Sequence, residues 1–117
     1  MQTKRIYHKV LNDGGITLTS RLVQVKKVKG FFVSLDKAGV IIPLSYFNPD
    51  SLTHAINELN PYLLKGRFIG VWVDKSNDKV YIDISEWIEG RNEAIQKGIT
   101  ENQIAVWDIE KGQEIYI

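Results

Sequence analysis

The chain contains no cysteine among its 117 residues, and this absence excludes several kinds of site. Disulfide bonds, cysteine nucleophiles and thiolate metal sites all require that residue. No apolar run approaches the ~20 residues that span a bilayer, so we expect no membrane segment. The first residues, MQTKRIYHKV, have no apolar core like that of a signal peptide. We therefore expect a cytoplasmic protein.

Several signatures of catalytic and cofactor sites are also missing. The sequence has no GxSxG elbow, no glycine-rich phosphate loop ending in Lys-Ser/Thr, and no HExxH motif. Only His8 and His54 could supply an imidazole base or ligand. His8 lies in a basic stretch, and His54 is expected to face solvent from a helix. The sequence therefore predicts no catalytic residues, no metal site and no cofactor.

Composition is that of one ordinary globular domain spanning residues 1–117, with 44% apolar and 25% charged residues. The net charge of +1 conceals an asymmetry along the chain. Residues 1–69 hold ten Lys or Arg against four Asp or Glu, whereas residues 70–117 hold five against ten. Such a distribution either draws the two halves together or presents a basic surface to an acidic partner.

The first segment, residues 3–47, reads as strand-rich. Residues 16–28, ITLTSRLVQVKKV, are rich in β-branched side chains. The apolar runs at 31–35 and 40–44 flank Asp36-Lys37-Ala38-Gly39, a short polar connection that predicts a hairpin.

The second segment is a helix over residues 49–60. Asn48 is placed to cap it and Pro49 to occupy its first position. Apolar residues then recur at helical spacing, at Leu52, Ala55, Ile56 and Leu59. Pro61 ends the pattern.

The third segment, residues 67–117, predicts a β-hairpin, a short helix and a second β-hairpin. RFIGVWVD and KVYIDIS form the first hairpin, residues 90–97 the helix with Gly98 as its left-handed stop, and QIAVWDI and QEIYI the second hairpin. Strands and helices are segregated rather than alternating. The sequence therefore predicts an α+β fold with a mainly antiparallel sheet.

Alternation divides the side chains of the first hairpin between two faces. One face carries Val71, Val73, Val80, Ile82 and Ile84, and the other carries Trp72, Asp74, Tyr81 and Asp83. The aliphatic face is expected to pack on a helix, which leaves the opposite face partly solvated. Asp83 then needs no catalytic explanation.

Carboxylates offer an alternative interpretation, a small metal-dependent hydrolase or nuclease. It requires Asp74, Asp83, Glu86 or Asp108 to converge, because divalent metals favour clustered oxygen ligands. The sequence does not establish convergence.

A second alternative is nucleic-acid binding through basic N-terminal strands. Basic residues at Arg21, Lys26, Lys27 and Lys29 precede Phe31 and Phe32. Charge that follows phosphates and rings that stack on bases are the requirements for binding single strands. Successive strand residues point to opposite faces, so at most one of the two phenylalanines is expected to be exposed.

The tryptophans all fall in the third segment, at Trp72, Trp87 and Trp107. Clustered aromatic side chains in a small domain are expected to belong to the core. Any that are exposed would be good anchors for a protein interface, where Trp and Tyr are enriched.

Part of the chain also shows a recognisable pattern. It consists of Trp72-x-Asp74, Tyr81-x-Asp83-x-Ser85, Ala94 and Gln103-x-Ala105-x-Trp107-Asp108 before a glycine-containing turn. Over residues 71–112 this pattern resembles small uncharacterised proteins of bacterial and phage genomes. The resemblance implies a phage or mobile-element context, brings no activity with it, and directs attention to Asp74, Asp83, Gln103 and Asp108.

Together these observations favour a non-enzymatic protein that docks on a macromolecular partner. A protein is the expected partner, and nucleic acid is the alternative. The expected binding residues are Trp72, Asp74, Tyr81, Asp83, Gln103, Trp107 and Asp108.

Overall fold

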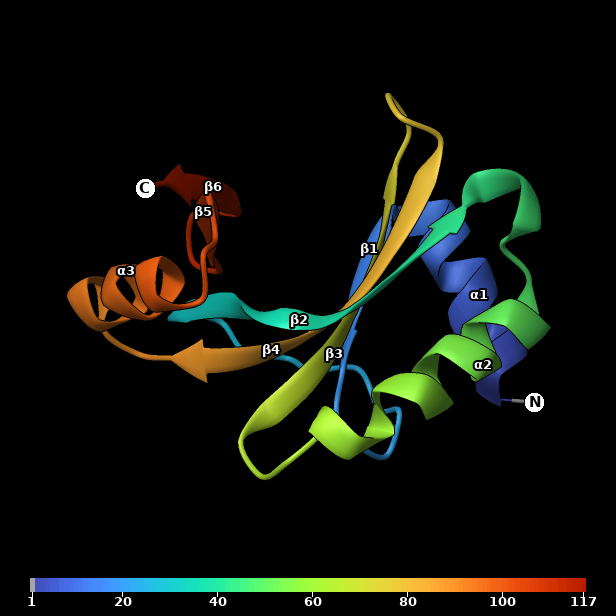
Figure 1. Ribbon diagram of the computed structural model, residues 1–117, viewed down its shortest axis with the longest axis horizontal. Coiled ribbons are helices and arrows are strands. Elements are labelled where there is room, and N and C mark those ends of the chain that lie inside the picture. The colour runs from blue at the N-terminus through green and yellow to red at the C-terminus, as the bar shows by residue number, and fades with distance from the viewer. Residues whose placement is uncertain (1) are drawn as a thin grey trace.

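The computed structural model describes residues 2–117, apart from the side chain of Lys37. Its elements are α1 (Gln2–Asp13), β1 (Gly15–Leu18), β2 (Phe31–Pro43), η1 (Leu44–Tyr46), α2 (Pro49–Leu59), η2 (Asn60–Tyr62), β3 (Arg67–Asp74), β4 (Lys79–Ile88), α3 (Arg91–Thr100), β5 (Ala105–Asp108) and β6 (Gln113–Tyr116). The strands form one sheet in the order β1-β3-β4-β2-β5-β6, and every neighbouring pair is antiparallel. The predicted α+β class is confirmed (Figure 1).

The helices pack on one face of this sheet. Val80, Ile82 and Ile84 of β4 are fully buried there, in a core completed by α1 and α2. A smaller cluster, in which Val33 of β2 packs with Ala94 of α3, continues the same face toward β5. We call this surface the helix side. The prediction that the aliphatic face of the first hairpin packs on a helix is therefore confirmed.

The expectation of a strand-rich segment over residues 3–47 is wrong for its first part, because Gln2–Asp13 form helix α1. Ile6 and Val10, one helical turn apart, are buried against the sheet. Tyr7 packs its ring against that of Phe47, with 5.1 Å between centroids. The helix forms because this spacing aligns its apolar side chains on one stripe, while the polar residues between them remain in solvent.

The expected hairpin around residues 36–39 is also wrong, because β2 is one long strand. Both of its halves pair with β4, and the register shifts between Ser34 and Gly39. The intervening bulge buries Leu35 and Ala38 on the helix side. Its outer residue is tied to the end of α3, because the Asp36 N–H donates to Glu101 Oε1 at 2.9 Å. Burial and this anchor replace the turn that the polar residues suggest.

Strand β1 is much shorter than the predicted run over residues 16–28. It ends at Leu18, and an isolated bridge between Leu18 and Gln24 is all the further pairing described there. Residues 19–30 instead form the connection from β1 to β2, which we call the basic loop. The basic residues expected on strands therefore lie on a loop.

The predicted helix over residues 49–60 is confirmed as α2, with Asn48 as its cap. The Ser51 N–H donates to Asn48 Oδ1 at 2.9 Å, and the Asn48 N–H donates to Ser51 Oγ at 3.0 Å. This reciprocal pair satisfies backbone groups that the first turn leaves free.

Helix α3 continues past Gly98, so the predicted stop there is wrong. Asn102 adopts the left-handed conformation, with φ of 57°, and the Gln103 N–H donates to the Gly98 carbonyl at 2.8 Å. These are the features of a Schellman C-cap. Gly98 itself is buried, and a Cβ there would lie 2.8 Å from Val106 Cγ1. The glycine therefore allows α3 to lie close against β5.

Candidate functional site

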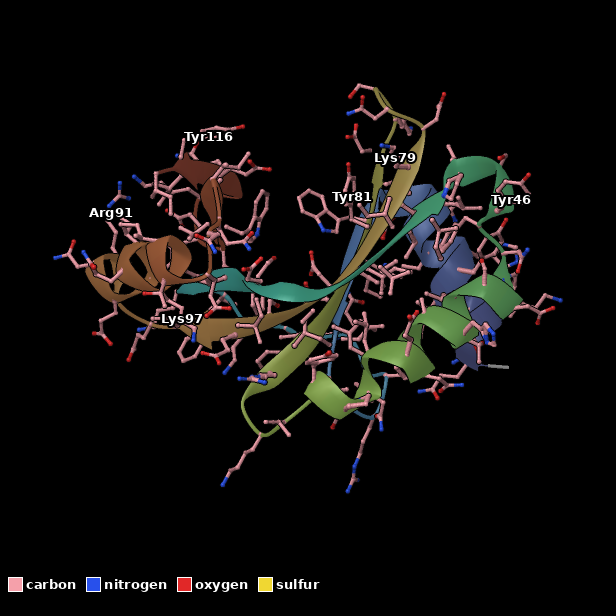
Figure 2. The ribbon with its side chains drawn as sticks, viewed as in Figure 1. Tyr46, Lys79, Tyr81, Arg91, Lys97 and Tyr116 are labelled. Carbon is pink, nitrogen blue, oxygen red and sulfur yellow. The ribbon has the colours of Figure 1, made fainter. Side chains whose placement is uncertain are left out.

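The face of the sheet opposite the helices is hollowed into a groove of about 1130 Å³. Its floor is formed by β2 and β4, one wall by the β3–β4 hairpin with β1, and the other by β5 and β6. Figure 2 shows Tyr81 on the β3–β4 hairpin, on the side toward β5 and β6. We call this feature the open-face groove, and its principal lining residues are Phe32, Ser34, Trp72, Tyr81, Asp83 and Trp107.

Aromatic side chains stand on both walls of the groove. Trp72 of β3 is 44% exposed and Trp107 of β5 is 40% exposed. The expectation that the clustered aromatics belong to the core is therefore wrong for these two. Alternation along each strand directs them away from the helix side, where the core lies. They are available as contact surfaces instead.

Further apolar side chains lie beside these rings. Ile104, just before β5, lines the groove and is 77% exposed. Ile41 of β2 pairs with Tyr81 of β4 and is exposed on the same face. Exposed apolar residues gathered around one concavity indicate an interaction site, whereas scattered ones are normal.

Asp83 lies in the floor, and its neighbours on both adjacent strands are glycines. It pairs with Gly70 of β3 and with Gly39 of β2. A Cβ at Gly70 would come within 2.9 Å of Asp83 Oδ1, so a side chain there would press against the carboxylate, and glycine leaves the space beside Oδ1 open to the groove. The paired glycines therefore leave the Asp83 carboxylate at the bottom of a pit in the floor.

The electrostatic environment of Asp83 is unusual for an aspartate. Burial raises its pKa from 3.8 to about 6, although hydrogen bonds from Trp72 and Ser34 act in the opposite direction. The Ser34 hydroxyl donates to Asp83 Oδ2 at 3.4 Å. Among the ion pairs of the described residues, none includes Asp83. At neutral pH the groove therefore holds an anionic carboxylate without a cationic partner from the described side chains.

Acidic residues outnumber basic ones around the groove. The lining includes Asp13, Asp74, Asp83 and Glu114, against Lys75. Asp74 is engaged locally, because its carboxylate accepts hydrogen bonds from Ser76 Oγ at 2.6 Å and Asn77 Nδ2 at 2.8 Å. These bonds lower the pKa of Asp74. The lining side chains therefore carry more negative than positive charge.

Six of the seven binding residues expected from the sequence line this one groove: Trp72, Asp74, Tyr81, Asp83, Gln103 and Trp107. Asp108 does not line it. Its side chain is buried, only 5% exposed, and Asp108 Oδ1 accepts a hydrogen bond from the Lys111 N–H at 3.2 Å. That contact fixes the turn between β5 and β6.

The carboxylates considered for a metal site are thus divided between two environments. Asp74 and Asp83 reach the groove, whereas Asp108 does not. Within residues 2–117, no group of three or more His, Cys, Asp or Glu side chains could hold a metal ion. None of the helices in that part of the chain is long and apolar enough to cross a membrane.

The basic residues proposed for nucleic acid lie elsewhere, on the basic loop: Arg21, Lys26, Lys27 and Lys29. The Lys27 ammonium lies 4.2 Å from the centroid of the Trp87 ring, and Lys29 Nζ lies 3.9 Å from Glu89 Oε2. The Trp87 indole also donates to the Lys29 carbonyl at 2.9 Å. Two of the four cations therefore already have a neighbour within the protein.

Sequence reasoning missed the glycines that create the pit. An isolated glycine within a strand pattern indicates close approach of another group, and Gly70 in RFIGVWVD carries that signal. Gly39 carries none, because it reads as part of a turn. Its role depends on β2 continuing as a single strand.

Searches of protein-family models, curated protein sequences and solved structures find no match to this chain.

Proposed function

We propose that this chain is a non-enzymatic binding protein that docks a segment of a protein partner in the open-face groove. The observation that carries the proposal is the exposure of Trp72 and Trp107 on opposite walls of one concavity. Trp and Tyr dominate the energetics of protein interfaces because each removes a large rigid surface from water.

The size of the groove supports a peptide segment as the occupant. Sites for small molecules run from about 300 to 1,000 Å³, and the groove, at about 1130 Å³, exceeds them. It is also open along one side of the sheet rather than enclosed. A segment of several residues could place apolar side chains between the two walls, against Trp72 and Trp107.

The alternatives gain less support from the same contacts. A metal-dependent hydrolase would need the carboxylates together, yet Asp108 is committed to a turn. The basic residues expected to bind nucleic acid lie on the basic loop, outside the groove. The groove itself has four acidic residues and one lysine in its lining, and repulsion between like charges disfavours phosphates there.

Peptide selection tests the proposal directly. Peptides from a random library displayed on phage would be selected on the wild-type protein, and their affinities measured by fluorescence polarisation. We expect Trp72→Ala and Trp107→Ala each to weaken binding about tenfold or more, the scale of an interface hot spot. Tyr46→Ala is the control, because Tyr46 is an exposed aromatic residue on η1, outside the groove.

Two results would count against the proposal. One is a selection that enriches no peptide. The other is a set of peptides that bind both tryptophan variants as well as they bind the wild type.

A further inference from the structure

We infer that the open-face groove recognises an arginine of its partner segment, whose guanidinium group enters the pit above Gly70 and pairs with the Asp83 carboxylate. The inference rests on the proposed function, since it names the chemistry that the docked segment must present. Geometry, charge and the aromatic walls each contribute an independent reason.

The geometry provides both an opening and an oriented acceptor. Gly70 and Gly39 place no side chain beside Asp83 on either neighbouring strand. The Ser34 hydroxyl donates a hydrogen bond to Asp83 Oδ2 at 3.4 Å, while Asp83 Oδ1 lies beside the space that a Cβ at Gly70 would occupy. A pre-oriented carboxylate at the bottom of a pit suits a donor group carried on a long side chain.

The charge distribution selects a cation. An ionised carboxylate removed from water is costly unless a cation or several hydrogen bonds compensate it. Asp83 has no cationic partner among the described side chains, and Asp74 and Glu114 add further negative charge to the lining, whereas Asp13 is paired with Lys9 at 2.7 Å. An arriving cation would therefore replace solvent as the counter-charge. Such complementary charges also steer encounter and fix register.

The aromatic walls favour arginine over lysine. A guanidinium is planar, presents five donors, is weakly hydrated, and stacks on aromatic faces. Trp72 and Tyr81 lie on the wall nearest Asp83, and Trp107 lies on the opposite wall. An ammonium is more strongly hydrated and lacks the flat surface that such walls can hold.

Indole N–H signals give a direct test, because the chain has three tryptophans. The ¹⁵N-labelled protein would be titrated with N-acetyl-arginine amide, followed by the lysine and citrulline analogues. We expect arginine to shift the Trp72 and Trp107 indole signals in a saturable way. Trp87 serves as the internal reference, because its indole is bonded to the Lys29 carbonyl outside the groove. Citrulline, the neutral isostere of arginine, should leave all three signals unmoved.

Two variants locate the effect on Asp83. Asp83→Asn should weaken arginine binding about tenfold or more, as expected when one partner of a buried charge pair is removed. Asp78→Asn is the matched control, because Asp78 lies in the turn of the same hairpin, outside the groove lining, and asparagine tolerates its φ of 53°. Gly70→Ala keeps the carboxylate but fills the pit, so it should also abolish the arginine shifts. This variant keeps the inference testable if Asp83→Asn does not fold.

Three results would overturn the inference: no saturable shift with arginine, equal shifts with citrulline, or equal affinity for lysine. Its failure is distinguishable from failure of the proposed function. Selected peptides that lack arginine yet lose affinity in Trp72→Ala would sustain docking and overturn the arginine assignment. If arginine binds but no selected peptide depends on the groove, the arginine site at Asp83 would be supported and the proposal of peptide docking would be wrong.

Discussion

Gly70 and Asp83 face each other across β3 and β4, and a Cβ on Gly70 would lie 2.9 Å from Asp83 Oδ1. Real Cβ atoms essentially never approach another atom so closely, so any residue larger than glycine at position 70 would force the carboxylate to move. The floor of the groove is therefore shaped by the absence of a side chain on one strand and the presence of a charge on the next.

Substitution of this glycine should affect binding more than folding. Gly70→Ala forces the Asp83 carboxylate to move, while the added methyl group improves the strand propensity. We expect the free energy of unfolding to change by less than about 1.5 kcal/mol, whereas affinity for selected peptides falls about tenfold. Chemical denaturation and fluorescence polarisation measure the two effects. Gly39→Ala, on the other side of Asp83, should weaken binding less, because its Cβ would meet nothing nearer than the Ile82 carbonyl oxygen at 3.5 Å and would leave the carboxylate in place. Wild-type affinity in Gly70→Ala would contradict the role of the pit.

Asp83 should make stability fall as pH rises. Its folded pKa of about 6 exceeds the ordinary value of 3.8, so between these values the native state holds a proton that the unfolded chain has released. The stability that the protonated Asp83 contributes is fully present below the unfolded-state pKa of 3.8, and it is lost as pH rises through the folded-state pKa of about 6. Each pKa unit is worth about 1.4 kcal/mol, so the loss is on the order of 1–3 kcal/mol.

Asp83→Asn should remove this pH-dependent component. The free energy of unfolding of the variant should therefore rise relative to that of the wild type as pH rises. Urea unfolding at about pH 3 and about pH 7.5, on either side of the two pKa values, measures that change. The other charged or titratable groups around the groove, Asp13, Asp74, Lys75, Tyr81 and Glu114, stay in place in both proteins. A constant difference in stability across this range would refute the assignment to Asp83.

Asp108 should prove structural. Asp108→Ala removes the acceptor of the Lys111 N–H in a buried setting, and we expect a loss of about 1–2 kcal/mol in unfolding free energy. Affinity for selected peptides, measured on the folded variant, should not change. Glu110→Ala, at an exposed position in the same turn, should stay within about 0.5 kcal/mol of the wild type. A tenfold loss of affinity in Asp108→Ala would place this residue in the binding site after all.

The packing of α1 can be tested by truncating one of its buried side chains. Ile6→Ala should destabilise the protein by about 2–4 kcal/mol, because it opens a cavity between helix and sheet. His8→Ala, on the exposed face of the same helix, should have little effect. Thermal unfolding followed by circular dichroism measures both. Equal midpoints for the two variants would show that α1 contributes little to the core.

Local chemistry was sufficient to predict some elements from the sequence. Asn48 and Pro49 mark the start of α2 because capping and ring geometry act within one turn of chain. The two faces of the first hairpin follow from alternation alone, which places four of the expected binding residues, Trp72, Asp74, Tyr81 and Asp83, on the groove side. These inferences depend on neighbours in sequence.

Other elements depend on distant partners and could not be predicted in this way. The segment 36–39 has the composition of a turn, but β4 pairs with both sides of it and Glu101 binds the backbone of Asp36. In α1, two buried residues among many polar ones give a weak periodic signal. The pit at Asp83 likewise appears only once three strands are aligned.

Strand β2 is shared by both parts of the helix side, since Leu35 and Ile42 pack with α1 and α2 while Phe31 and Val33 pack with α3. Strand β5 joins β2 through two residue pairs, at Phe31 and Phe32. The Trp107 wall of the groove therefore joins the main sheet through few strand pairs and through the packing of Val106 with Ala94 of α3, whereas the Trp72 wall is part of the main sheet. Regions with fewer contacts open at lower free energy than the rest of a domain, so we expect amide protons of β5 and β6 to exchange faster than those of β3 and β4.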